Sequence, residues 1–121
     1  MNFGRYKALA VGVALVMAGS SSYAADAPAA FKACLNCHKV EPGVKLMGPS
    51  LFGVVGRKAG SVADFAYSDP MKNSGITWDE AHLVTYIADP KAAVPGTKMV
   101  FAGIKKPDEV SVIVEYLKTL K

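Results

Sequence analysis

The chain has few of the residues that build covalent or metal-bound frameworks: two cysteines, two histidines and one tryptophan among 121 residues. Two cysteines are too few for the several disulfides of a small secreted scaffold. Cys34, Cys37, His38 and His82 could bind zinc, but no second pair stands at zinc-finger spacing. Internal repeats, low-complexity runs and strand-like alternation are also missing, which disfavours repeat proteins and β-sheet folds.

The first 25 residues have the features of a secretory signal. Arg5 and Lys7 form the positive start, Ala8–Ala18 the apolar centre and Ser20–Ala25 a small-residue cleavage site. The apolar run is shorter than the roughly 20 residues that cross a bilayer. We therefore predict that residues 1–25 are removed on export to the periplasm. The alternative is an uncleaved membrane anchor, and N-terminal sequencing of the mature protein distinguishes the two.

Residues 26–121 are expected to form one domain, because about 96 residues can bury only a modest core. Without Arg5 and Lys7 the chain has twelve basic and ten acidic residues, a net charge of about +2. This mild charge gives no indication of nucleic-acid binding. It suits weak, steered docking on an acidic protein partner, provided that the lysines cluster.

The segment Cys34-Leu35-Asn36-Cys37-His38 reads C-x-x-C-H, the attachment pattern of a c-type haem. Two cysteines three apart on one helical turn can both form thioethers with the haem edge. His38 can then reach the iron with a neutral ring nitrogen. A thioredoxin-like redox pair would require a βαβ context that the sequence lacks, and a simple disulfide would leave His38 without a role.

The apolar pattern and the cap residues predict an all-α fold with long loops. Short helices are expected at 27–36, at 69–74 after the N-cap Ser68, and at 91–94. Thr77–Glu80 reads as a capping box that starts a helix at 78–88. The last helix begins near Pro107, and its apolar face consists of Val110, Ile113, Val114, Leu117 and Leu120. The stretch 39–67 has few helical signals, and wrapping around a flat apolar cofactor would account for so long a loop.

A second iron ligand is less sharply indicated by the residues alone. Met47, Met71 and Met99 follow the signal, and a lone methionine is usually core filler. Met99 is favoured because it comes after the turn residues Pro95-Gly96, far from the C-x-x-C-H segment, and can approach the opposite haem face. His82 is the rival ligand, although its position on a helix face away from the apolar residues favours an exposed histidine.

Several further motifs make the chain similar to the small class I cytochromes c of the mitochondrial and bacterial soluble type. Besides the C-x-x-C-H segment they are Gly48-Pro49, Gly53–Gly60, Gly75–Trp78 and Pro95–Ile104, and they span nearly all of residues 26–121. The resemblance implies the cytochrome c fold, with three main helices and long loops around one covalently attached haem c and its iron.

The resemblance also implies the iron ligands. His38 would be the proximal ligand and Met99 the distal one, while the Pro49 carbonyl would accept a hydrogen bond from the far ring nitrogen of His38. Two positions depart from the family pattern. Met71 stands where many relatives have an asparagine tied to internal water, and a thioether cannot donate such a hydrogen bond. Asp26 replaces a frequent glycine before the first helix.

Other side chains would surround the haem if the resemblance holds. Tyr67 and Trp78 would hydrogen-bond a haem propionate, and Arg57 would offset its charge. Tyr86 would lie near the Met99 sulfur, and Phe101 would shield the haem edge. Taken alone, Arg57 would be a solvated charge, and Tyr67 and Trp78 would be core aromatics with a satisfied polar tip.

We therefore expect a monomeric carrier of single electrons between respiratory or photosynthetic complexes, with no small-molecule substrate and no nucleic-acid partner. With both axial positions filled, no open iron site remains, so enzyme activity is not expected. The alternative is a peroxidase or a nitric-oxide-binding haem protein, which requires the Met99 sulfur to be absent from the iron or labile. A weak band near the red end of the ferric spectrum would mark sulfur ligation.

Partner docking is expected through lysines around the haem edge: Lys91, Lys98, Lys105 and Lys106, which Lys32 and Lys45 could join. The alternative is a set of merely solvated lysines. Raising the ionic strength should slow electron transfer from an acidic redox partner, because salt screens the charges that orient the encounter. Stopped-flow rates over a range of salt concentrations test this, and rates that do not vary with salt would argue against steering.

Overall fold

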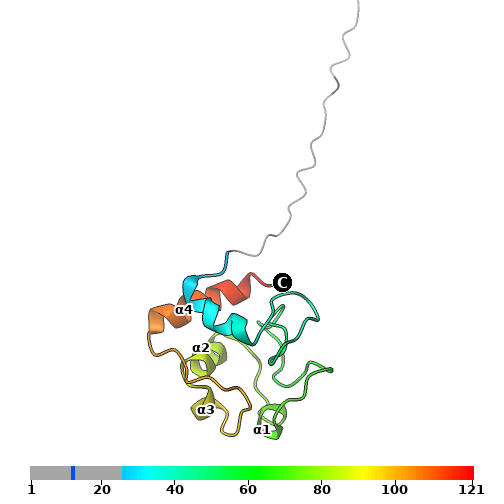
Figure 1. Ribbon diagram of the computed structural model, residues 1–121, viewed down its shortest axis with the longest axis vertical. Coiled ribbons are helices and arrows are strands. Elements are labelled where there is room, and N and C mark those ends of the chain that lie inside the picture. Colours follow the sequence, from blue (N-terminus) through cyan, green and yellow to red (C-terminus); the bar gives the residue numbers. More distant parts are fainter. Residues whose placement is uncertain (1–11, 13–25) are drawn as a thin grey trace, which may run out of the picture.

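The computed structural model describes Gly12 and residues 26–121. In this part of the chain short helices are joined by long loops (Figure 1). In chain order the helices are η1 (Ala29–Asn36, a 3-10 helix), α1 (Asp69–Lys72), α2 (Glu80–Ala88), α3 (Pro90–Ala93) and α4 (Pro107–Lys118). The same residues contain no strand, only the isolated bridges His38–Lys45 and Lys58–Thr77. None of the described helices combines the length and the apolarity that crossing a membrane requires.

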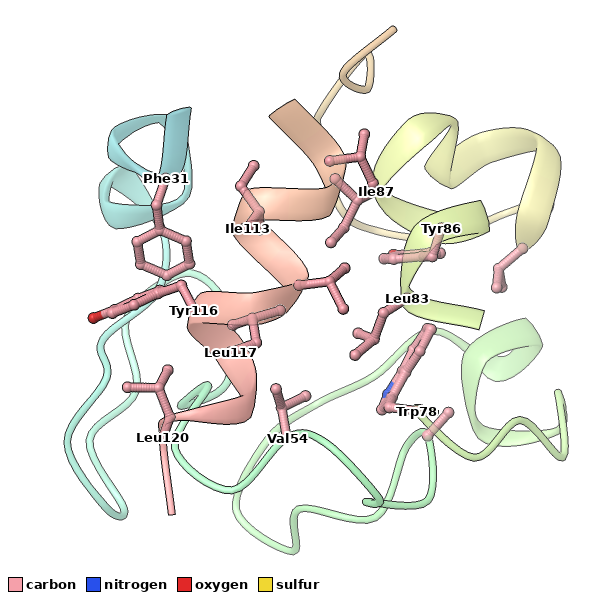
Figure 2. Packing of buried hydrophobic residues seen from close by; sticks show 14 of the residues in the cluster. Phe31, Val54, Trp78, Leu83, Tyr86, Ile87, Ile113, Tyr116, Leu117 and Leu120 are labelled. Carbon is pink, nitrogen blue, oxygen red and sulfur yellow. The ribbon is translucent and has the colours of Figure 1, made fainter. Parts of the chain in front are cut away.

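Helix α4 is the centre of the core and packs against both η1 and α2 (Figure 2). It starts at Pro107, as predicted. Phe31 of η1 is fully buried, and its ring meets that of Tyr116 edge-on at a centroid distance of 4.6 Å. The face predicted from the apolar period is buried throughout: Val110, Ile113, Val114, Leu117 and Leu120. Helix α4 therefore joins the C-x-x-C-H segment, which begins in the last turn of η1, to the rest of the domain.

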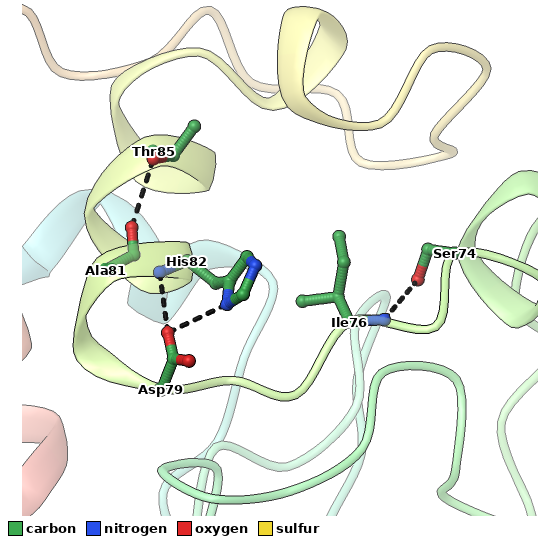
Figure 3. A network of polar contacts seen from close by, with 6 residues as sticks. All are labelled: Ser74, Ile76, Asp79, Ala81, His82 and Thr85. Atoms are coloured by element: carbon green, nitrogen blue, oxygen red, sulfur yellow. Dashed lines mark hydrogen bonds and ion pairs between the residues drawn. The ribbon is translucent and has the colours of Figure 1, made fainter.

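Helix α2 begins two residues later than predicted, and its N-cap is Asp79. The Asp79 carboxylate accepts hydrogen bonds from the backbone N–H of His82 at 2.9 Å and from the His82 ring at 2.8 Å (Figure 3). Thr77 pairs instead with Lys58 in an antiparallel bridge. The capping-box prediction is wrong because a backbone partner distant in sequence holds Thr77 outside the helix.

The other helices differ from the predictions only at their ends. Helix η1 starts at Ala29, because Pro28 occupies the N-cap position. Ser68 caps α1 as predicted, and its hydroxyl accepts a hydrogen bond from the Met71 N–H at 3.2 Å. Helix α1 ends at Lys72, two residues before the predicted end, and α3 starts one residue earlier than expected.

The long loop between η1 and α1 is held by backbone hydrogen bonds of its turns and by side chains that donate to its carbonyl groups. Arg57 donates to the carbonyls of Ser50 and Phe52, at 2.8 and 2.6 Å. The Lys45 ammonium donates to the carbonyl of Asp64, further along the same loop. Since carbonyl groups removed from water need donors, these side chains serve carbonyls that the backbone bonds of the turns leave free.

Replacing Asp79 with alanine should lower the free energy of unfolding, because helix α2 loses its N-cap. Thr77→Ala is the matched control and should change the free energy of unfolding little, since Thr77 pairs through its backbone.

The stability that Asp79 contributes should also depend on pH. The hydrogen bond from the His82 backbone holds the pKa of Asp79 below its ordinary value of 3.8. The Asp79 contribution is therefore complete above that value and is lost as the pH falls through the lower folded-state pKa. Urea denaturation followed by circular dichroism at several pH values measures both effects. If Thr77→Ala lowered the free energy of unfolding more than Asp79→Ala, the capping box would be the correct description after all.

Candidate functional site

The C-x-x-C-H segment leaves the last turn of η1 and bends around the carbonyl of Cys34. The backbone N–H groups of Cys37 and His38 both donate to that carbonyl, at 3.1 and 2.9 Å. Cys34 lies on the helix and Cys37 immediately past its end, and both thiols are free and half-buried. The segment thus brings two thiols and an imidazole together within one tight turn.

These thiols lack the properties of a redox pair or a zinc site. Burial, reinforced by the nearby Cys37, raises the pKa of Cys34 to about 11, whereas redox-active pairs depend on a thiol whose pKa is lowered. Among the described residues, no three Cys, His, Asp or Glu side chains are placed to hold a metal ion. Both alternatives to haem attachment are therefore disfavoured.

His38 is held in one orientation by the backbone of the long loop. Its Nδ1 donates to the Pro49 carbonyl at 2.8 Å, which is the hydrogen bond that the family resemblance implied. Burial lowers the pKa of His38, and the Arg57 charge adds to this against the opposing effect of the Pro49 hydrogen bond. The ring is therefore neutral at neutral pH. With the proton on Nδ1, the Nε2 atom keeps the lone pair that a metal ligand needs.

Gly48 makes room for this ring. A Cβ atom at Gly48 would lie 2.3 Å from Cε1, 2.7 Å from Nδ1 and 2.9 Å from Nε2 of His38. Contacts this short are not tolerated, so the absence of a side chain lets the backbone approach the imidazole closely. The sequence identified Gly48 only through its place before Pro49, and that dipeptide was the one available signal.

Met99 is half-buried. Thr97, two residues earlier, anchors the backbone of the segment that contains it. The backbone N–H of Met99 donates to the Thr97 hydroxyl at 3.3 Å, and that hydroxyl pairs with the Tyr86 hydroxyl at 2.8 Å. Burial raises the pKa of Tyr86, and the hydrogen bond to Thr97 opposes this shift. Sequence reasoning placed Tyr86 near the Met99 sulfur but missed Thr97, which connects Tyr86 to the Met99 backbone.

Arg57 and Tyr67 lie close together, while Trp78 joins the core. Burial raises the pKa of Tyr67, and a hydrogen bond from the Val62 N–H at 3.3 Å and the neighbouring Arg57 charge oppose that shift. Arg57 uses two of its five N–H donors on loop carbonyls. Trp78 is buried, with its ring centroid 5.0 Å from that of Tyr86. The roles of these side chains toward a haem propionate stay predictions.

The long loops supply apolar side chains that pack against the core yet stay partly exposed: Leu51, Phe52, Val55, Tyr67, Ile76 and Met99. A flat apolar ring system attached to Cys34 and Cys37 would cover such side chains and so remove apolar surface from water. The donor set and the apolar surroundings therefore both fit haem c. His82, the rival ligand, has a side chain that is 50% exposed and paired with Asp79.

Comparison with known proteins agrees with this site. Residues 19–121 match the family model described as Cytochrome c. Cytochrome c2 iso-2 of Magnetospirillum molischianum is 60% identical over 97 residues, which cover 80% of this chain and 100% of that protein. Cytochrome c2 of Rhodoplanes tepidamans is 53% identical over 97 residues, which cover 79% of this chain and 99% of that protein.

A solved structure, cytochrome cH from Methylobacterium extorquens, superposes on this chain with a TM-score of 0.71 at 55% sequence identity. The superposition covers 74% of this chain and 91% of the other. The similarity confirms the all-α cytochrome c fold that the sequence predicted.

Replacing Gly48 with alanine should displace the His38 ring and lower the free energy of unfolding by about 1–3 kcal/mol, the usual cost of overpacking. Urea titration followed by circular dichroism measures this loss, and pigment content of the exported protein reports haem attachment. Pro49→Ala is the matched control, because alanine keeps the carbonyl that His38 requires. Equal losses in the two variants would contradict the role assigned to Gly48.

Proposed function

This chain belongs to the cytochrome c family, and on that premise we propose that it is a soluble, monomeric, periplasmic one-electron carrier with His38 and Met99 as its iron ligands. Members of the family carry electrons and are not enzymes, and they bind haem c covalently with its iron. The ligand pair, the compartment and the docking residues are what is proposed for this chain in particular.

The position of His38 is the observation that carries the proposal. The Pro49 carbonyl holds the Nδ1 proton at 2.8 Å, and burial lowers the pKa of the ring, so that Nε2 presents its lone pair. A carbonyl partner of this kind fixes the tautomer and raises the basicity of an imidazole ligand. Cys34 and Cys37, within the same turn, would hold the haem by thioethers.

Met99 would supply the second axial ligand from a segment far along the chain. When bound, the haem provides a redox couple that gains or loses one electron, and a soft sulfur ligand favours its ferrous form. The Thr97 hydroxyl, itself paired with Tyr86, holds the backbone of the Met99 segment. With His38 and Met99 in both axial positions no site would be open to a substrate, which suits a carrier.

The apolar core supports a ferrous preference by keeping water away. Met71 is 7% exposed and Trp78 8%, and both belong to the main apolar cluster. Met71 cannot donate a hydrogen bond in the way that the asparagine of many relatives does. We propose that Met71 contributes packing instead, and that dry surroundings disfavour the additional charge of ferric iron.

Docking to larger redox proteins would depend on charge. Lys91, Lys98, Lys105 and Lys106 are all exposed and, together with a mildly basic domain, would orient an acidic partner. Such docking gives rapid, weak and salt-sensitive encounters. One carrier can then meet a donor and an acceptor in turn.

Residues 1–25 would be a cleaved export signal and residues 26–121 the mature domain. All of the signal except Gly12 lies outside the described residues. The proposed mature domain has the length of these relatives, since 97 aligned residues cover 100% and 99% of two cytochromes c2. Export would place the cysteines where c-type haem is attached and where thiols can be oxidised.

Replacing Met99 with alanine should abolish the weak band near the red end of the ferric spectrum. It should also lower the reduction potential by on the order of a hundred millivolts or more, within the span of about 0.8 V that axial ligands control. Met47→Leu and Met71→Leu are the matched controls, and both should keep the band. Visible spectroscopy and redox titration of the exported protein measure these effects. A band that survives in Met99→Ala would overturn the ligand assignment.

A further inference from the structure

We infer that Lys98 and Lys105 are positioning residues that fix the two ends of the Met99 segment, in addition to any part they have in docking. The inference deepens the proposed function, since it concerns the segment that would carry the sulfur ligand. It arises from where these ammonium groups lie, because both donate to backbone carbonyls of other segments. Lys91 and Lys106, which belong to the same predicted docking set, do not.

Lys98 connects the beginning of the segment to the long loop. Its Nζ lies 3.4 Å from the carbonyl oxygen of Ala66 and 3.5 Å from that of Tyr67. These carbonyls are 32 and 31 residues away in sequence, and Lys98 directly precedes Met99. One ammonium group has three donors and can serve both carbonyls. The bond therefore joins the residue next to the proposed sulfur ligand to the loop that contains Tyr67.

Lys105 connects the end of the segment to helix α2. Its Nζ donates to the carbonyl of Ala88 at 2.9 Å and lies 3.8 Å from a carboxylate oxygen of Asp89. Ala88 is the last residue of α2, where carbonyls lack partners within the helix and the helix dipole favours a cation.

The backbone just before Lys105 also contacts the end of helix α2. The N–H of Ile104 donates to the carbonyl of Ile87 at 3.0 Å. Gly103 has a φ of +100°, and a Cβ there would lie 2.1 Å from the carbonyl oxygen of Ala88. The segment after Met99 is therefore pressed against the end of α2, and the Lys105 ammonium closes that contact from the solvent side.

Between these two attachments the chain makes few apolar contacts with other parts of the polypeptide. Val100 is 91% exposed, Ala102 is exposed and Phe101 is only half-buried. Few apolar contacts within the polypeptide are typical of segments that open locally at low cost. Bonds at both ends shorten the length of chain that is free to move, and so favour the closed position of Met99.

Lys91 and Lys106 provide the contrast. Both are exposed, and within residues 26–121 neither ammonium group makes a hydrogen bond or an ion pair. Their charges are available for steering alone. The four docking lysines therefore divide into two that hold the Met99 segment and two that do not.

Amide hydrogen exchange on the full haem-loaded protein, followed by NMR, tests this division. Lys98→Ala should speed exchange at the Thr97 and Met99 amides about threefold to tenfold, as expected for the loss of one hydrogen bond. Lys105→Ala should do the same at the Ile104 amide. Arginine at either position should restore slow exchange, since a guanidinium can also donate to carbonyls.

The controls are Lys91→Ala and Lys106→Ala, which remove the same charge and should leave those amides unchanged. Unchanged exchange in Lys98→Ala and Lys105→Ala, or an equal acceleration in the controls, would overturn the inference. The ferric band near the red end separates this result from the proposed function. Its absence from the unmodified protein would refute sulfur ligation by Met99, whereas the amides would still report whether the lysines hold the segment.

Discussion

The structure depends on the hydrogen bond from Nδ1 of His38 to the carbonyl of Pro49. It joins the turn after η1 to the long loop, and it decides which ring nitrogen keeps a lone pair. Gly48 allows the backbone to come close enough for this bond, since a Cβ would collide with the ring. Fold and chemistry therefore have the same requirement: a donor and a carbonyl eleven residues apart must meet at 2.8 Å.

The long loops also depend on hydrogen bonds to backbone carbonyls. In a domain with few helices, many carbonyls lack helical partners, and they must find donors or stay in water. Arg57 and Lys45 donate to carbonyls within the long loop, whereas Lys98 and Lys105 donate to carbonyls of other segments. Cationic side chains suit this role because their charge strengthens the hydrogen bond and their long apolar stems reach across the surface. Part of the basic character of the domain thus serves its architecture.

The two proposed iron ligands differ in how firmly their surroundings hold them. His38 lies against the end of a helix that packs on α4 and is fixed by Pro49 and Gly48. Met99 lies in a half-exposed segment that is attached by side-chain hydrogen bonds and by the backbone bond from Ile104 to Ile87. A carrier needs little rearrangement between its two redox states, and the Met99 side is where the chain leaves most freedom. The attachments of the Met99 segment therefore have the most direct effect on how far the proposed iron site rearranges between the two redox states.

Local spacing alone was sufficient for the C-x-x-C-H segment and for the buried face of α4, because each depends on residues a few positions apart. Local spacing misled at helix α2, where the capping box predicted Thr77 as the N-cap and the structure has Asp79 instead. The bridge between Thr77 and Lys58 keeps Thr77 outside the helix. This pairing cannot be inferred from the residues next to Thr77 in sequence. The contact of Gly48 with the His38 ring is of the same kind. Such pairings exist only when distant parts of the chain have come together, so local sequence patterns cannot predict them.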